Sequence, residues 1–201
     1  MKIVVIGATG IIGKAVADAL SGRHEVIRAS RHGAVKVDIE DAASLERLFA
    51  TVKDVDAVVC CAGSAAFKPL ADLTDADFQL GLRSKLLGQV NVVRVAMRHL
   101  RDGGSITLTS GVLAREPMRG ASAISLVNAG LEAFAGGAAL ELPRRLRVNV
   151  VSPPWITETL VALKMDTKGG IPAAACAKAY AAAVEGAQTG MTIDARAHAG
   201  R

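Results

Sequence analysis

The sequence predicts an open, doubly wound α/β fold, in which helices cover both faces of a mostly parallel sheet in three α/β/α layers. Short apolar runs alternate with helix-length amphipathic stretches, and most of these runs are too evenly apolar for a sheet with one wet face. With 201 residues, 51% of them hydrophobic, the chain is expected to form a single domain over residues 1–201. Residues 195–201 have nothing obvious to bury and are expected as a disordered tail.

The expected elements follow one another in βαβα order. Strands are expected at Lys2–Ile6, Glu25–Ala29, Asp56–Cys61, Ser105–Thr109 and Arg147–Val151. Apolar periodicity, often with Asp, Ser or Thr near its start, predicts helices over Ile11–Leu20, Ala42–Val52, Phe78–Leu100 and Ala123–Leu142. An Ala-rich stretch predicts a further helix over Pro172–Gly186, and Met191–Asp194 is expected as an edge strand.

Composition favours a small anionic ligand over nucleic acid, metal or membrane. The net charge is +5, but aromatic residues make up only 3% and no dense basic run occurs. No uncharged apolar run of about 18 residues is present and no signal peptide is expected, so the expected location is cytoplasmic. The cysteines, Cys60, Cys61 and Cys176, lack metal-ligand spacing and are expected as reduced, mostly buried thiols.

The stretch VVIGATGIIGKAVADAL carries three glycines between the first strand and the first helix. Gly7 permits a tight turn, Gly10 lets a pyrophosphate approach the backbone, and Gly13 lets the helix pack closely on the sheet. The helix N-terminus offers free amides and a partial positive charge. The spacing G-x-x-G-x-x-G is weak evidence alone, but its place between strand and helix predicts a dinucleotide site. The alternative is a glycine-rich turn that binds no ligand.

The end of the second strand favours NADP(H). An NAD site usually places an acidic residue there to hold the ribose hydroxyls, whereas this chain has Ser30-Arg31-His32. The guanidinium of Arg31 suits a 2′-phosphate, and Ser30 can donate a further hydrogen bond. NAD(H) remains the second choice, and a solvated surface arginine is the structural alternative.

The chain resembles the short-chain dehydrogenase/reductase family over nearly its whole length, in four ordered motifs. These are GATGIIG (with Thr9, Ile11 and Ile12), Asp38-Ile39, Cys61-Ala62-Gly63, and RVNVVSPP followed by Trp155-Ile156. The resemblance implies a Rossmann fold, with Asp38-Ile39 bordering the adenine and Cys61, Ala62 and Gly63 lining the inner ribose and nicotinamide. Pro153, Trp155 and Ile156 would lie beside the nicotinamide. Cys60 and Cys61 replace asparagines that are frequent in the family, and Pro154 replaces a usual glycine.

The active-site motif of the family is broken. Family enzymes use Tyr-x-x-x-Lys, in which tyrosine transfers the alcohol proton while lysine lowers its pKa and holds the nicotinamide ribose. In this chain Ile124 stands at the tyrosine position and Asn128 at the lysine position. The family serine is matched by Ser110, with Thr109 one position away as the alternative, and a family asparagine is matched by Lys85. The chain is most similar to a short bacterial subgroup that keeps the glycine motif but lacks these active-site residues.

The exchange of lysine and asparagine suggests a different catalytic set. If Lys85 enters the space left by the dyad, its ammonium could hold the ribose or polarise a carbonyl, with Ser110 and Asn128 donating hydrogen bonds. The alternative is a surface Lys85, a packing Asn128 and a strand-end Ser110. The only tyrosine, Tyr180, is expected to pack in the C-terminal helix with its hydroxyl at the surface.

Three functional classes remain open. The first is an oxidoreductase that moves hydride between NADP(H) and a small carbonyl or alcohol. The second is a noncatalytic NADP(H)-binding sensor or regulatory subunit, and the third is a structural oligomer partner that binds no nucleotide. The resemblance also implies a homodimer or homotetramer, in which the helices Leu82–Leu100 and Ala123–Leu142 pair across two-fold axes.

Overall fold

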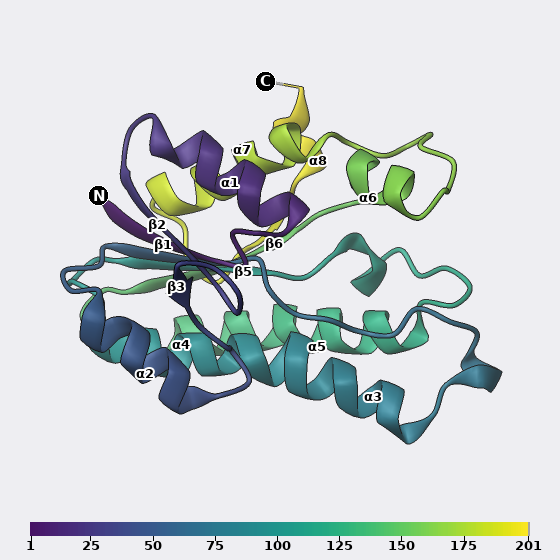
Figure 1. Cartoon of the computed structure of the whole chain (residues 1–201), viewed down its shortest axis with the longest axis horizontal. Coiled ribbons are helices and arrows are strands. Elements are labelled where there is room, and N and C mark those ends of the chain that lie inside the picture. The colour runs from purple at the N-terminus through teal and green to yellow at the C-terminus, as the bar shows by residue number, and fades with distance from the viewer. Residues whose placement is uncertain (201) are drawn as a thin grey trace.

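A computed structural model describes residues 1–200 of the chain. Over these residues it shows a seven-stranded sheet in the order β3-β2-β1-β4-β5-β6-β7, with every neighbouring pair parallel. The predicted doubly wound fold is therefore confirmed (Figure 1). The strands are β1 Lys2–Ile6, β2 Glu25–Ser30, β3 Val35–Lys36, β4 Ala57–Cys60, β5 Ser105–Thr109, β6 Arg147–Ser152 and β7 Thr192–Asp194.

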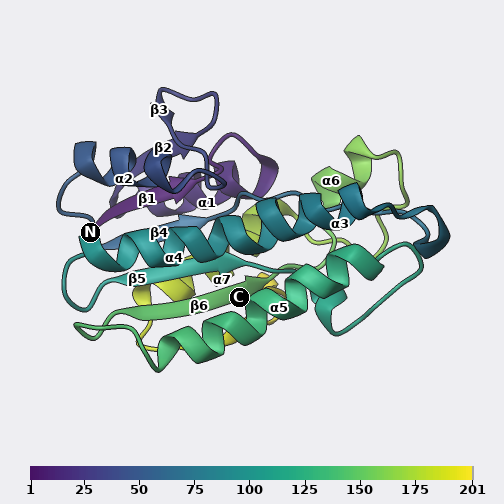
Figure 2. The ribbon, with the colours of Figure 1, turned by 90° about the horizontal axis from the view of Figure 1, so that it is seen from below.

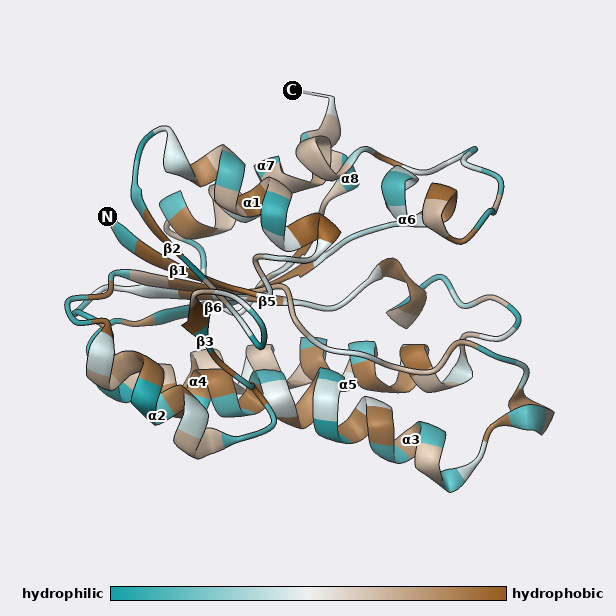
Figure 3. Cartoon of the chain, viewed as in Figure 1, coloured by the Kyte–Doolittle hydropathy of each residue, from teal (hydrophilic) through white to brown (hydrophobic). Residues whose placement is uncertain are grey.

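Helices cover both faces of this sheet (Figures 1 and 2). One face carries α1 Ile11–Ser21 and α7 Ala173–Glu185, and the other carries α2 Ala42–Thr51, α4 Gly88–His99 and α5 Ser122–Ala139. Along β1, Ile3 and Val5 pack in the core beneath α1 and α7, whereas Val4 and Ile6 pack in the core on the opposite face of the sheet. Because successive strand side chains point to opposite faces, both sets must be apolar. The central strands are correspondingly hydrophobic in Figure 3.

The single helix predicted over Phe78–Leu100 is wrong. The structure has α3 Asp75–Gly81, a π-helical turn η2 Leu82–Leu87, and then α4. Helix α3 begins earlier than predicted because Thr74 and Asp77 form a capping box, each side chain accepting a hydrogen bond from the other's backbone amide. The π-helical turn leaves the helical path nearly continuous, so apolar periodicity could not reveal it.

The other predicted elements are present, with small differences at their ends. Helix α5 ends three residues before the predicted Leu142, and the remaining predicted boundaries agree to within one residue. Five short elements were not predicted because they are too short to show apolar periodicity. They are β3, the 3₁₀ turns η1 Leu70–Asp72 and η3 Val112–Ala114, α6 Thr157–Ala162 and α8 Arg196–Ala199.

The tail expected over residues 195–201 is structured in its first part, which corrects that expectation; residue 201 lies outside the described residues. Ala195 is fully buried, and α8 follows it. The guanidinium of Arg196 donates hydrogen bonds to Asp194 and to Glu116 on the loop after β5. These charge-assisted bonds hold the end of the chain against the loop.

Residues 1–200 contain neither a membrane-spanning helix nor a cluster of metal ligands. None of their helices is long and apolar enough to cross a bilayer. Their His, Cys, Asp and Glu side chains form no group of three that could bind a metal ion.

Candidate cofactor and catalytic site

The loop between β1 and α1 forms a tight backbone cradle. Gly7 has a φ of +83°, and a Cβ there would lie 2.9 Å from backbone atoms of Cys61 and Ala62. A Cβ on Gly13 would lie 2.1 Å from the carbonyl oxygen of Gly7, so a side chain at Gly13 would push α1 away from the loop. No side chain caps α1 at Gly10, which leaves its first amides available to an anion. The cradle therefore fits a pyrophosphate.

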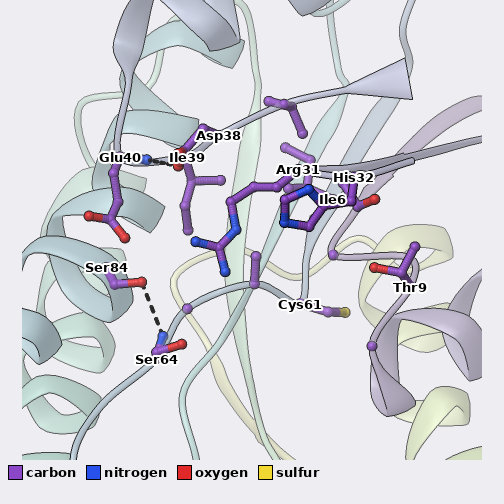
Figure 4. A pocket seen from close by; sticks show the side chains of 16 residues that line it. Ile6, Thr9, Arg31, His32, Asp38, Ile39, Glu40, Cys61, Ser64 and Ser84 are labelled. Carbon is purple, nitrogen blue, oxygen red and sulfur yellow. Dashed lines mark hydrogen bonds between the residues drawn. The ribbon is translucent and has the colours of Figure 1, made fainter. Parts of the chain in front are cut away.

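A cavity of about 210 Å³ opens beside this cradle, at the end of β2 (Figure 4). The Ser30 hydroxyl is buried there and has no hydrogen-bond partner among the described residues. Arg31 is exposed, and Figure 4 shows its side chain extending along the cavity, with Glu40 on the far side. The Arg83 guanidinium donates a 3.0 Å hydrogen bond to Glu40, which lowers the pKa of that carboxyl group. An unpaired hydroxyl beside a guanidinium suits a phosphate group.

A second cavity of about 420 Å³ lies at the carboxyl ends of β4, β5 and β6. Lys85, Ser110 and Asn128 all line it, so the structure brings the three predicted catalytic residues together. Ile124, which the resemblance to the family aligns with its tyrosine, lines the same cavity. The rest of the wall is largely apolar, and Phe67 packs edge-to-face on Trp155 with their ring centroids 5.7 Å apart.

The π-helical turn η2 places Lys85 in this cavity. Its backbone carbonyl accepts a 3.1 Å hydrogen bond from the side chain of Gln89. Its aliphatic stem packs on Gly63, where a Cβ would lie 3.1 Å from the Lys85 Cδ. Lys85 is partly buried, and the loss of hydration lowers the pKa of its ammonium group. The predicted alternative of an ordinary surface lysine therefore does not describe this side chain.

Ser110 is linked to a carboxylate that the sequence did not predict. Its hydroxyl donates a 2.7 Å hydrogen bond to Glu132 Oε1, while Arg115 Nε lies 3.7 Å from Glu132 Oε2. Glu132 stands one helical turn after Asn128 on α5 and is mostly buried, with its side chain 13% exposed. The Asn128 amide nitrogen donates a 3.4 Å hydrogen bond to the Gly111 carbonyl, and its buried side-chain oxygen has no partner within residues 1–200.

A buried polar cluster lies beneath the two cavities. Thr109 donates a 2.6 Å hydrogen bond to the Cys60 carbonyl, and its hydroxyl lies 2.9 Å from that of Tyr180. Tyr180 is fully buried, so the prediction of a surface hydroxyl is wrong. Burial raises the pKa of Tyr180 well above its ordinary value, and it raises the pKa of Cys60 to about 11. These groups therefore stay protonated near neutral pH.

The predicted cofactor residues fall into three groups. Gly7, Thr9, Gly10, Ser30, Arg31, Asp38, Ile39, Cys61, Ala62 and Gly63 line the first cavity. Ile12, Pro153, Trp155 and Ile156 line the second. Ile11 and Gly13 line neither, because Ile11 is 41% exposed at the start of α1 and Gly13 packs beneath the loop.

Several residues of the site were missed from the sequence. His32, Glu40, Ser64 and Ser84 line the first cavity, and Glu132 bonds to Ser110. Only Glu132 had a usable signal, since it follows Asn128 by four residues and therefore shares its helix face.

An open parallel sheet with a glycine cradle at its carboxyl edge defines a dinucleotide-binding class of protein. Residues 7–191 match a family model described as enoyl-(acyl carrier protein) reductase. The chain belongs to the short-chain dehydrogenase/reductase family of oxidoreductases.

Similar proteins support this assignment. An uncharacterized oxidoreductase of Methylorubrum extorquens is 30% identical over 178 residues, covering 76% of this chain and 72% of that protein. The protein lin1944 from Listeria innocua has a crystal structure with 40% identity and a TM-score of 0.92, covering 96% of this chain and 98% of that one. A small-chain dehydrogenase in complex with NADPH has 30% identity and a TM-score of 0.86, covering 99% and 98%.

Some curated relatives are longer. A hydroxynaphthalene reductase-like protein of Metarhizium brunneum is 32% identical over 132 residues, covering 62% of this chain. This match spans 49% of the relative's length.

Proposed function

We propose that the protein is an NADP(H)-dependent oxidoreductase that moves hydride to or from a small carbonyl or alcohol. The observation that carries the proposal is that the two cavities share Cys61, Gly63 and Ser64. A dinucleotide bound at the glycine cradle would extend from the Arg31 end of the first cavity into the second cavity, toward Lys85. The similar small-chain dehydrogenase in complex with NADPH supports the same reading.

The residues present fit the phosphorylated cofactor. The uncapped N-terminus of α1 would hold the pyrophosphate, and the unpaired Ser30 hydroxyl together with Arg31 would hold a 2′-phosphate. Bound NADP(H) supplies or accepts a hydride. Lys85, Ser110 and Asn128 would orient and polarise the substrate oxygen in place of the absent tyrosine.

Ile124 favours a second candidate function. An isoleucine side chain cannot transfer a proton, and it lines the cavity where the family tyrosine would stand. A protein that binds NADP(H) without turnover, acting as a sensor or regulatory subunit, would retain the cradle and tolerate this loss.

The test is a fluorescence titration with NADPH and NADH, using Trp155, the only tryptophan, as reporter. Arg31→Ala is expected to weaken NADPH binding by about ten- to a hundredfold and to leave NADH binding unchanged, since it removes charge-assisted bonds to the phosphate alone. Arg94→Ala, an exposed arginine on α4, removes the same charge elsewhere and should have no effect.

The other outcomes separate the candidate functions. If the native protein binds neither nucleotide, both cofactor-dependent functions fail and a structural role remains. If it binds NADPH but reduces none of a broad panel of aldehydes and ketones, the sensor is favoured.

We also propose that the protein forms a homodimer or homotetramer through the face made by η2, α4 and α5. Leu87 and Leu126 are each 51% exposed on this face, which leaves apolar surface in water.

A further inference from the structure

Lys85 brings a positive charge without a counter-ion into the second cavity. Among the residues that line this cavity, Lys85 is the only one whose side chain is ordinarily charged at neutral pH. Its ammonium makes no hydrogen bond or ion pair with another side chain of residues 1–200. A partly buried ammonium loses hydration, and here no carboxylate of the protein compensates for that loss.

The groups nearest to Lys85 do not supply the missing negative charge. Cys60 and Cys61 lie within electrostatic range, but burial raises the pKa of both thiols, so they are neutral at physiological pH. The carboxylate of Glu132 lies outside the cavity lining. It accepts the hydrogen bond from Ser110 and faces Arg115.

The stem of Lys85 is held by its surroundings. Gln89 binds its backbone carbonyl, and Gly63 packs against its Cδ. A lysine that is held in this way at a cavity wall, with three donor hydrogens, is a suitable partner for oxygen atoms of a bound ligand.

We propose that the substrate of this site carries a carboxylate beside the reacting carbon, as in a small oxo acid or hydroxy acid, and that Lys85 binds the carboxylate. This assignment rests on the proposed oxidoreductase function. One ammonium can bridge a carboxylate oxygen and the neighbouring carbonyl oxygen. The remaining wall, which includes Ile124, Val112 and Trp155, suits a short apolar substituent.

The reaction balances with the proposed cofactor. Reduction of the oxo carbon adds one hydride from NADPH to carbon and one proton from solvent to oxygen, which gives a hydroxy acid and NADP⁺. The carboxylate is unchanged and serves for binding alone.

The experiment compares acids with their methyl esters, which lack the charge that Lys85 would bind and are larger by one methyl group. Pyruvate and 2-oxobutyrate are titrated against methyl pyruvate and methyl 2-oxobutyrate, with and without NADP⁺, and Trp155 in the cavity wall reports binding. The acids are expected to bind the native protein about tenfold to a hundredfold more tightly than the esters. Lys85→Met should abolish this preference, and Lys85→Arg should keep part of it.

Lys168→Met is the matched control, because Lys168 is an exposed lysine on the loop after α6. It should keep the full preference for acids. Equal binding of acids and esters by the native protein, a preference that survives Lys85→Met, or no binding of any probe would overturn the assignment.

NADPH titration of the same samples separates this inference from the proposed function. Intact NADPH binding without any acid preference contradicts the substrate class alone. Acid binding without NADPH binding contradicts the proposed oxidoreductase and leaves an acid-binding site at Lys85. Circular dichroism of Lys85→Met and Lys85→Arg confirms that each variant is folded.

Discussion

Cys60 and Cys176 are fully buried thiols whose protonation is linked to folding. Burial raises the pKa of Cys60 to about 11 and that of Cys176 to about 12, from an ordinary value of 9.0. An unfolded chain therefore loses these protons first as the pH rises. Their effect on stability is absent below about pH 9, becomes increasingly destabilising between pH 9 and the folded-state pKa values, and levels off above them.

We expect the free energy of unfolding to fall by about 5 kcal/mol between pH 8 and pH 11 because of these two thiols. The measurement is urea denaturation of the native protein and of a Cys60→Ala, Cys176→Ala variant across this range. Lys85 acts in the opposite direction, since its pKa is lowered, but it is present in both proteins and cancels in the comparison. Equal pH dependence in the two proteins would contradict the prediction.

At the residue scale, the sequence predicted which residues form the site better than it predicted the hydrogen bonds between them. The glycine cradle, Ser30 and Arg31 could be predicted because each type of residue has one physical reason to stand at that point of a strand-loop-helix unit. The hydrogen bond from Ser110 to Glu132 could not be predicted. It depends on how far α5 lies from the end of β5, and no local pattern encodes that distance.

Gln89 joins two elements and is the polar side chain that α4 buries most completely, with no exposed surface. Its amide nitrogen donates to the carbonyls of Lys85 and Thr109, and its oxygen accepts a 2.8 Å hydrogen bond from the Thr109 amide. It thus satisfies the backbone of β5 beyond the point where pairing with β4 stops, at Val59 and Thr107.

Gln89→Leu is expected to lower the free energy of unfolding by about 3 kcal/mol, since it strands several buried backbone groups without a partner. Gln79→Leu, an exposed glutamine on α3, controls for the change in side-chain chemistry and should have little effect. Urea denaturation at pH 7 measures both. A loss no larger than that of the control would show that water replaces the side chain.

At the element scale, the strands were predicted almost to the residue, because a strand covered on both faces is mostly apolar and is usually ended by polar or glycine residues. The elements that the sequence did not predict have no apolar periodicity of their own. The π-helical turn Leu82–Leu87 keeps the helical path, whereas η3 is bonded to α5 through Ser125 and α6 to the start of α7 through Glu158.

For the whole molecule, the exposed apolar side chains predict self-association. In Figure 2, α3, α4 and α5 lie together on one side of the sheet. A Leu87→Glu, Leu126→Glu variant is expected to be monomeric, because buried carboxylates at the dimer contact would have no partner. Light scattering after size-exclusion chromatography measures the mass of each form. Val161→Glu changes a more exposed apolar residue, 62% exposed on α6 and away from this face, and should remain associated.

If the native protein is itself monomeric, the proposed self-association through this face is wrong. The cofactor and substrate experiments would be unaffected, since both cavities are lined by residues of one chain.

The all-parallel sheet also has a consequence for how the chain folds. No two neighbouring strands can form a hairpin, because each pairing must wait for a crossover segment to be in place. Strand β1 finds its inner neighbour β4 only after residue 57 is available, and β4 in turn waits for β5 at residue 105. An N-terminal half that ends before Ser105 therefore leaves one edge of β4 unpaired, and an unpaired apolar strand edge favours aggregation until β5 is available.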